Sequence, residues 1–332
     1  MDNYTLFLLK NSGQKHNITG LIGNLVWKDS IDTLGMELSF DKAHSDEKYM
    51  AVHDVVELGD KLVLMNNNVE VFRGIITDES IDGRFGRSYI AFDYAFYLNK
   101  SKTIIQFNKL KGSDSIKKLC EKFSVPIGNI TQINTLINKI YKDKTVAEII
   151  KDILDQATKE KGIKYRLEMR AGKLHIEKYT DLVITAKFQP AYNLASFDVT
   201  KAIGNVSSSR SIQDMKNSII ITSSDEKSTR VYASTQDKAS ISKYGLIQDV
   251  QSADDKNIAQ ATNIAKNQLK LLNKITEDTS IELLGNDNVR AGRILVINEP
   301  ITGLSGQYLV KECEHNYKNH IHTMKLNVEK VK

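Results

Sequence analysis

Four side chains that can bind a metal ion lie close together near the end of the sequence. The stretch KECEHNYKNHIHTMKLNVEK, residues 311–330, contains Cys313, His315, His320 and His322. Thiolate and imidazole groups are the usual protein ligands of zinc, so this stretch could hold a structural or a catalytic metal. It could equally be the last hairpin of a packed β domain. The elements around these residues have to decide between the two.

The hairpin alternative makes a definite geometric prediction. With Lys318–Asn319 as the turn, the expected cross-strand pairs are His320 with Tyr317, His322 with His315 and Met324 with Cys313. Alternation along each strand then places the cysteine and the three histidines on one face. Met324, Leu326 and Val328 share that face, which makes it an interior one. Zinc sites also favour close ligand pairs such as C-x₂-C. The sequence therefore predicts packing and no bound metal, with a zinc-stabilised hairpin as the alternative.

Composition describes an ordinary globular protein. The chain has 332 residues, of which 41% are hydrophobic and 26% charged, enough for two or three domains. No apolar run approaches the roughly 18 residues of a membrane helix, and residues 1–13 do not resemble a secretory signal. With Cys120 and Cys313 as the only cysteines, a disulfide framework is not expected. We expect synthesis in a reducing cytoplasm.

Positive charge is concentrated in the middle of the chain. Residues 101–190 hold 18 Lys and Arg against 10 Asp and Glu, whereas residues 1–100 have a net charge of −5. Nucleic-acid binding would call for stacking aromatic residues among the lysines. Here the lysines lie on helices whose other face is apolar, which is typical of a solvated surface. We expect this basic region to face outward, toward neighbouring proteins.

The pattern of residues divides the chain into three domains, and the fold class is mainly β with an α/β insert. Residues 1–107 read as short strands separated by turns, and the last of these strands is expected at Ser88–Tyr97. Residues 108–190 read as two helices and a hairpin. Residues 191–332 return to the β pattern, interrupted by one helix at about 252–275.

The insert has the clearest local signals. A helix is expected from Ser113–Asp114 toward Pro126, and a second one in TVAEIIKDILDQATKEKG. In that second helix Thr145 and Glu148 form a capping-box pair, and Gly162 is a C-terminal stop. A hairpin then follows at residues 164–179, with RAGK as its turn.

A weak internal repeat links the first and last domains. The stretch GDKLVLMNNNVEVFRG begins at Gly59, and GRILVINEPITGLSG begins at Gly292; each is followed by another pair of strands. Two copies of a closed β unit predict two similar small barrels. Aligned by eye, the first copy has Ser80, Asp82 and Ser88 near the positions of the Cys/His cluster. The first copy of the repeat therefore lacks these potential metal ligands.

Enzyme motifs are not found in the sequence. It contains no G-x-S-x-G, H-E-x-x-H or P-loop pattern, so no catalytic or cofactor-binding residues are assigned. Trp27, the single tryptophan, is expected in a core or a subunit contact. A cell-wall hydrolase or carbohydrate-binding module remains an alternative. Such a module would need an exposed aromatic row or a carboxylate pair in a cleft.

One family matches these features. The final stretch has a Gly-x-x-Gly step at Gly303–Gly306, then Tyr-x-Val and a closing His-Thr-Met-x-Leu. It resembles the XkdQ/YqbQ-type hub proteins of contractile phage tails and phage-tail-like bacteriocins. The N-terminal β unit, the insert with KTVAEIIKDIL and the NSIIIT strand fit the same layout.

This resemblance implies a structural protein and no enzyme. It implies a homotrimer in which two barrels per chain give a pseudo-sixfold collar. The collar would join the tail tube protein to the central spike protein and contact other baseplate proteins. The implied location is the bacterial cytoplasm during assembly and then the tail baseplate, without membrane contact and with DNA at most as passing cargo.

Overall fold

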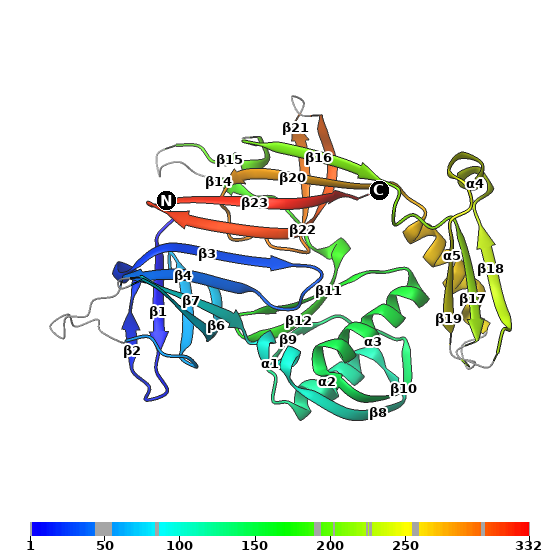
Figure 1. The fold of residues 1–332 in the computed structure, drawn as a ribbon, viewed down its shortest axis with the longest axis horizontal. Coiled ribbons are helices and arrows are strands. Elements are labelled where there is room, and N and C mark those ends of the chain that lie inside the picture. The colour runs from blue at the N-terminus through cyan, green and yellow to red at the C-terminus, as the bar shows by residue number, and fades with distance from the viewer. Residues whose placement is uncertain are drawn as a thin grey trace.

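The structure, a computed structural model, describes residues 2–43, 55–83, 86–188, 194–201, 203–223, 225, 228–253, 259–299 and 303–331. It is mainly β with an α/β insert, as predicted (Figure 1). Within these residues, no helix has both the length and the apolar character needed to cross a membrane.

The N-terminal region is a curved sheet around one core. Its elements are β1 Tyr4–Leu9, β2 Lys15–Asn17, the 3₁₀ helix η1 Thr19–Leu21, β3 Ile22–Ser30, β4 Glu37–Ala43, β5 Lys61–Asn66, β6 Val69–Asp82 and β7 Gly86–Asp93. Apolar residues at alternate positions fill the concave side; they include Leu6, Trp27, Leu38, Phe40 and Leu64. The strand expected to reach Tyr97 ends at Asp93, where the insert begins with a helix.

The insert packs three helices against short strands around a second core. Its elements are α1 Ala95–Lys100, β8 Lys102–Lys111, α2 Gly112–Lys122, β9 Ile127–Ile130, β10 Leu136–Thr145, α3 Val146–Lys161, β11 Tyr165–Arg170 and β12 Lys173–Lys178. The capping box at the start of α3 is formed: Glu148 N–H donates to Thr145 Oγ1, and Thr145 N–H donates to the Glu148 carboxylate. Gly162 ends the helix at φ 69°, as predicted.

The C-terminal region returns to the large sheet. Its elements are η2 Tyr179–Asp181, β13 Val183–Ile184, β14 Lys187–Phe188, β15 Phe197–Asp198, η3 Val199–Lys201, β16 Val206–Ser211, β20 Thr276–Leu284, β21 Ile294–Glu299, β22 Leu304–Lys318 and β23 Ile321–Lys330. Its own core is built from alternating residues of β20 to β23, such as Ile281, Leu283, Val310, Leu326 and Val328.

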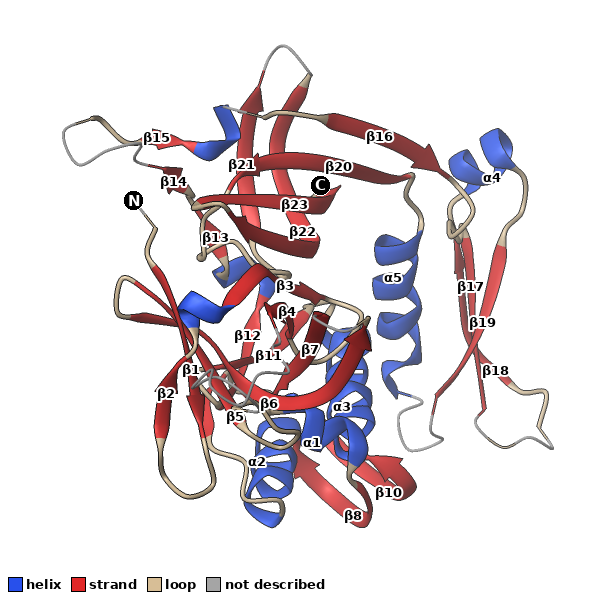
Figure 2. Ribbon diagram, turned by 60° about the vertical axis from the view of Figure 1, so that its left-hand side comes forward, coloured by secondary structure: helices blue, strands red, loops and turns tan. Residues whose placement is uncertain are grey.

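Between β16 and β20 the chain forms a small side unit. It contains β17 Ser218–Ser223, β18 Val231–Gln236, α4 Lys238–Tyr244, β19 Gln248–Ala253 and α5 Ala261–Leu272. Figure 2 shows this three-stranded sheet standing apart from the large sheet, with α5 beside it. The helix expected at about 252–275 is therefore shorter. Residues 248–253 form a strand, and residues 254–258, where its start was expected, lie outside the described residues.

The two halves share one sheet. Neighbouring strands follow the order β16, β20, β23, β22, β3, β4, β7, β6, which can be followed downward in Figure 1. The link is the antiparallel pairing of β22 with β3. Among the described strands no pairing closes either half on itself, so two separate closed barrels are not confirmed. Pairing between halves uses strand edges that a closed barrel would have paired internally.

The two copies of the repeat do fold alike. Gly59 N–H donates to Ile76 O (2.9 Å), and Ile76 N–H donates back to the carbonyl of the residue after Gly59 (3.0 Å). In the second copy Gly292 N–H donates to Val310 O (2.7 Å), and Val310 N–H donates back in the same way (2.8 Å). Both glycines have a left-handed φ, 89° and 86°, which side chains disfavour. The repeat is therefore present in the backbone.

A β-bulge then aligns the long middle strands. In β6 the register with β7 shifts directly after the residue bonded to the first glycine, and in β22 the register with β23 shifts at the same place. Counting onward, Cys313 corresponds to Glu79 and His315 to Ile81. These equivalents lie one residue before those of the alignment by eye. Neither carries a metal-binding nitrogen or sulfur.

Candidate functional site

The last hairpin turns one residue later than predicted. Asn319 and His320, with φ of 51° and 63°, are the turn residues, and Lys318 pairs with Ile321. Two successive positive φ angles are the geometry of a two-residue hairpin turn that follows the sheet twist, and asparagine tolerates it. The predicted turn at Lys318–Asn319, and the pairs derived from it, are therefore wrong by one residue.

This shift removes one histidine from the cluster. His320 is exposed in the turn, where its Nδ1 lies 3.2 Å from the Tyr317 hydroxyl. In the actual register His315 pairs with Met324, and Tyr317 pairs with His322.

Cys313, His315 and His322 do share the buried face, as predicted. Their exposed fractions are 1%, 1% and 4%. The Cys313 Sγ lies 3.0 Å from His315 Nε2, and His315 Nδ1 lies 2.9 Å from His322 Nε2. Burial raises the pKa of the Cys313 thiol well above its usual value, so this sulfur is a packed thiol.

The N-terminal half covers this face with aromatic rings. Trp27 on β3 pairs with His315, and their rings stack with centroids 5.0 Å apart and an interplanar angle of 5°. Tyr4 on β1 meets the His322 ring edge-on at 5.4 Å. Trp27 is 1% exposed, so it is a core residue at the junction of the halves.

Hydrogen-bond acceptors fix the protons of the first ring. His315 Nε2 lies 2.9 Å from the carbonyl oxygen of Val289, which can only accept, so Nε2 carries the proton. Burial, together with nearby His322, lowers the pKa of His315 to about 3, so the ring is neutral and its Nδ1 is an acceptor. His322 Nε2 is consequently the donor in the bond between the rings.

The second ring donates in both directions. His322 Nδ1 lies 3.0 Å from Asp2 Oδ2 and 2.9 Å from the Tyr4 hydroxyl, which itself donates to Asp287 Oδ1 (2.8 Å). Burial alone would raise the pKa of Asp2. Hydrogen bonds from His322 and Asn66 outweigh burial and lower this pKa, so Asp2 is an ionised acceptor. Both ring nitrogens of His322 are therefore placed to donate, Nε2 to His315 and Nδ1 to Asp2.

These partners come from parts of the chain far from the hairpin. Asn66 on β5 donates to both carboxylates, to Asp287 Oδ2 at 2.7 Å and to Asp2 Oδ1 at 3.1 Å. Asp287 lies in the connection between β20 and β21. The sequence singled out none of Asp2, Tyr4, Asn66 and Asp287, because no local spacing relates them to the hairpin.

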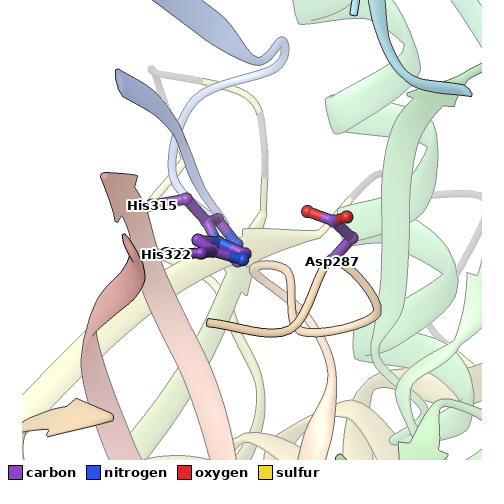
Figure 3. A group of neighbouring side chains, drawn as sticks. All are labelled: Asp287, His315 and His322. Atoms are coloured by element: carbon purple, nitrogen blue, oxygen red, sulfur yellow. The ribbon is translucent and has the colours of Figure 1, made fainter. Parts of the chain in front are cut away.

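A shared metal fits this geometry poorly. Asp287, His315 and His322 each bring one ligand atom, and the three atoms lie within 4.8 Å of one another (Figure 3). Two nitrogens bound to tetrahedral zinc at about 2.0–2.1 Å lie about 3.3 Å apart. The two facing ring nitrogens lie 2.9 Å apart, the spacing of a shared proton. The four ring nitrogens already have hydrogen-bond partners, so we interpret the cluster as a hydrogen-bonded contact between the two halves.

A second buried polar cluster ties in the insert. Glu168 on β11 accepts two hydrogen bonds from Arg293, at 2.8 and 3.2 Å. Arg166 on the same strand lies 3.5 Å from the Asp29 carboxylate of β3. Asp29 also accepts from the backbone N–H of Ala291 at 3.0 Å. The N-terminal half, the insert and the C-terminal half therefore meet around these charges.

Electrostatics make this cluster costly to disturb. Burial alone would raise the pKa of Glu168, but Arg290, Arg293 and Arg166 outweigh it and hold the pKa at about 2. Gly292 allows the backbone to lie close to the Arg166 side chain. A Cβ there would lie 2.5 Å from Arg166 Cδ. A side chain at position 292 would therefore push on a buried guanidinium.

A groove of about 1090 Å³ follows the outer face of the same junction. Across it, Lys325, Glu314, Lys28 and Glu37 occupy neighbouring strands and alternate in charge. Lys28 and Glu37 form an ion pair at 3.0 Å. Such cross-strand alternation stabilises a sheet surface, and we assign no chemistry to it.

A family model described as YQBQ-like matches residues 25–329. The chain belongs to the YqbQ-like family. The matched span begins within β3 and ends within β23, so it includes both halves of the sheet and the junction between them. The resemblance to XkdQ/YqbQ-type proteins predicted from the sequence is confirmed.

Two relatives come from Bacillus subtilis (strain 168). The uncharacterized protein YqbQ is 26% identical over 278 residues, covering 82% of each chain. The phage-like element PBSX protein XkdQ is 25% identical over 288 residues, covering 85% of this chain and 84% of XkdQ. Among solved structures, the tail protein from Neisseria meningitidis MC58 superposes with a TM-score of 0.70 at 12% identity, covering 99% of this chain and 97% of that one. The fold of the two proteins is shared.

Proposed function

We propose that the protein is a structural component of a phage tail or a phage-tail-like particle, and within it the baseplate hub. Family membership supports a tail role, since one relative belongs to a phage-like element and a protein of the same fold is a tail protein. The buried clusters support a structural role and no enzymatic one. Both clusters connect parts of the chain that are distant in the sequence. We assign no catalytic residue, metal or cofactor.

The duplicated sheet carries the hub proposal. The unit β3–β4–β7–β6 and the unit β16–β20–β23–β22 are joined edge to edge within one chain. Three chains would place six such units around an axis, so a homotrimer would have pseudo-sixfold symmetry. Such a ring would suit a sixfold tail tube protein on one side and a threefold spike protein on the other. Other baseplate proteins would contact the basic insert.

The predicted domains then take separate places in this proposal. The two halves that flank the insert would form the ring. The insert, predicted at residues 108–190 and built in the structure from the elements α1 to β12, would face outward. Assembly would take place in the bacterial cytoplasm, and the finished hub would be part of the baseplate.

The mass of the purified protein tests the proposal. Light scattering over a concentration series should give three times the 37.4 kDa chain mass, with the same value when a chelator is present. A chain that stays monomeric or forms only dimers would overturn the trimeric hub. A mass that falls on addition of the chelator would contradict the assignment of no metal.

A further inference from the structure

The row of eight strands has an unused edge at each end. At one end, β16 pairs only with β20 among the described strands. At the other end, β6 pairs with β5 no further than Ile75, so β7 is the one described strand that pairs with residues 78–82. Unpaired strand edges of this length are templates for pairing with another strand.

The register shows what belongs on these edges. In the N-terminal unit, Trp27 of β3 pairs with Leu38 of β4, which pairs with Ala91 of β7. In the C-terminal unit, Ser208 of β16 pairs with Thr279 of β20, which pairs with Val328 of β23. Ala91 and Val328 both pair with the residue directly before the bulge of the long middle strand, Ile76 or Val310. Thus β3 is the equivalent of β16, and β6 is the equivalent of β22.

Within the chain, one such junction already exists. The far half of β22, Glu312 to Tyr317, pairs with β3 from Ser30 back to Leu25. The equivalents of these two segments are residues 78–83 and the strand β16. They lie at opposite ends of this row of eight strands, and so they can meet only between two copies.

We infer that residues 78–82 of one copy pair antiparallel with β16 of a second copy, in the register that joins β22 to β3. This contact rests on the proposed trimer and names its interface. It places Ile81 opposite Ser208 of the partner subunit and Glu79 opposite Arg210 of the partner subunit. The contact is heterologous, so repeating it around a ring leaves no free edge when the ring closes.

Exposure and charge agree with this pairing. Ile81 is 66% exposed, whereas its equivalent His315 is 1% exposed at the junction inside the chain. A large apolar side chain on a free strand edge is otherwise an aggregation hazard. The Arg210 side chain is 65% exposed, and in the proposed contact it would face the acidic segment of the other copy that contains Asp78 and Glu79. Opposite charges facing each other across two strands favour this register over neighbouring ones.

Cysteine cross-linking tests the register. Ser80 and Ser209 are exposed and would lie opposite each other, so the variant carrying S80C and S209C should form a covalent trimer on mild oxidation with copper phenanthroline. The native thiols Cys120 and Cys313 are buried. S80C alone, S209C alone, and S80C combined with S234C, a position on β18 in the side unit, should remain uncross-linked. Equal cross-linking of the S80C/S234C control would overturn the inference.

Charge reversal tests the same contact without covalent bonds. We expect E79R to raise the concentration at which trimers half-dissociate by about tenfold, because it places two cations opposite each other. Combining it with R210E should restore assembly, although R210E also loses the ion pair with Glu277 inside the chain. A protein that is trimeric by light scattering but fails both tests would overturn the strand pairing and leave the hub proposal intact. A chain that never trimerises would overturn both.

Discussion

The two four-strand units share their register but differ at the end of the long middle strand. In β22, residues 312–315 alternate between exposed and buried, and the buried ones are Cys313 and His315. In β6 the equivalent residues, 78–81, are all exposed. The difference lies in what faces each segment, because β3 covers the first and no described strand of the same chain covers the second.

The side chains on the covering strands differ accordingly. Trp27 of β3 stacks on His315, whereas its equivalent on β16 is Ser208. A tryptophan on an open strand would expose a large apolar area, and a serine does not. The same backbone therefore serves as a permanent junction in one place and, in our proposal, as an assembly contact in the other.

The largest expected effect is at the buried end. Trp27→Ala should lower the free energy of unfolding by about 4 to 5 kcal/mol, because it leaves a cavity beside two buried histidines. Urea unfolding followed by circular dichroism measures this loss. Ile81→Ala at the equivalent segment should change the stability of the isolated chain by less than about 0.5 kcal/mol. Similar losses for the two variants would remove the contrast between the ends.

Removal of the central carboxylate should cost somewhat less. Glu168→Leu leaves three buried guanidinium groups without their shared anion, which should cost about 3 kcal/mol in the same unfolding measurement. The control is Asp143→Asn, which breaks an ion pair with Lys102 whose side chains are 77% and 59% exposed. That variant should lose less than about 1 kcal/mol. If Glu168→Leu also lowered the free energy of unfolding by less than about 1 kcal/mol, the cluster would not be holding the three parts of the chain together.

The pH dependence of the free energy of unfolding should reveal the protonation of the buried His315 ring. The pKa of His315 is about 3 when folded, below the usual 6.5, so the unfolded chain binds the extra proton first. Stability from this group is present above pH 6.5 and is lost as the pH falls toward 3, by at most about 1.4 kcal/mol per pH unit. Burial raises the pKa of Asp93 to about 6. Protonation of this group therefore adds stability as the pH falls from 6 to 3.8, opposite to the effect of His315.

A variant isolates the histidine from this background. His315→Gln should show a flatter loss of stability between pH 6.5 and 3 than the parent protein, measured by urea unfolding at each pH. His320→Asn changes only the exposed turn histidine and should keep the parent's slope. An unchanged slope in His315→Gln would mean that the buried ring is not neutral in the folded protein.

The smallest expected effect is at the turn. His320→Gly should stabilise the protein by about 0.5 kcal/mol, because Asn-Gly is the preferred pair for a two-residue turn with positive φ. A thermal melt measures this gain. A destabilisation, or a change in zinc binding, would return His320 to the cluster and support the zinc-stabilised hairpin.

Local signals in the sequence gave correct predictions where each element is specified by its own residues. The capping box of Thr145 and Glu148 begins α3 as expected, and the spacing of apolar residues identifies the face that packs. The repeat was also visible, since the glycines at 59 and 292 are required by the backbone. The side unit was missed in part, because short strands such as Gln248–Ala253 alternate too weakly to be distinguished from the start of a helix.

The sequence by itself determined the mainly β class, the insert, the duplication and the shared face of Cys313, His315 and His322. The class, the insert and the shared face follow from spacing within about twenty residues, where strand and helix periodicity act. The duplication follows from comparing two such stretches, which begin at Gly59 and Gly292. Only the tertiary structure decided the hairpin register, the single sheet in place of two closed barrels, and the partners of the histidines. These involve contacts between distant parts of the chain: β3 pairs with β22, and Asp2 lies beside His322. Local propensity does not encode such meetings, because burial and hydrogen bonding select them only once the strands have paired.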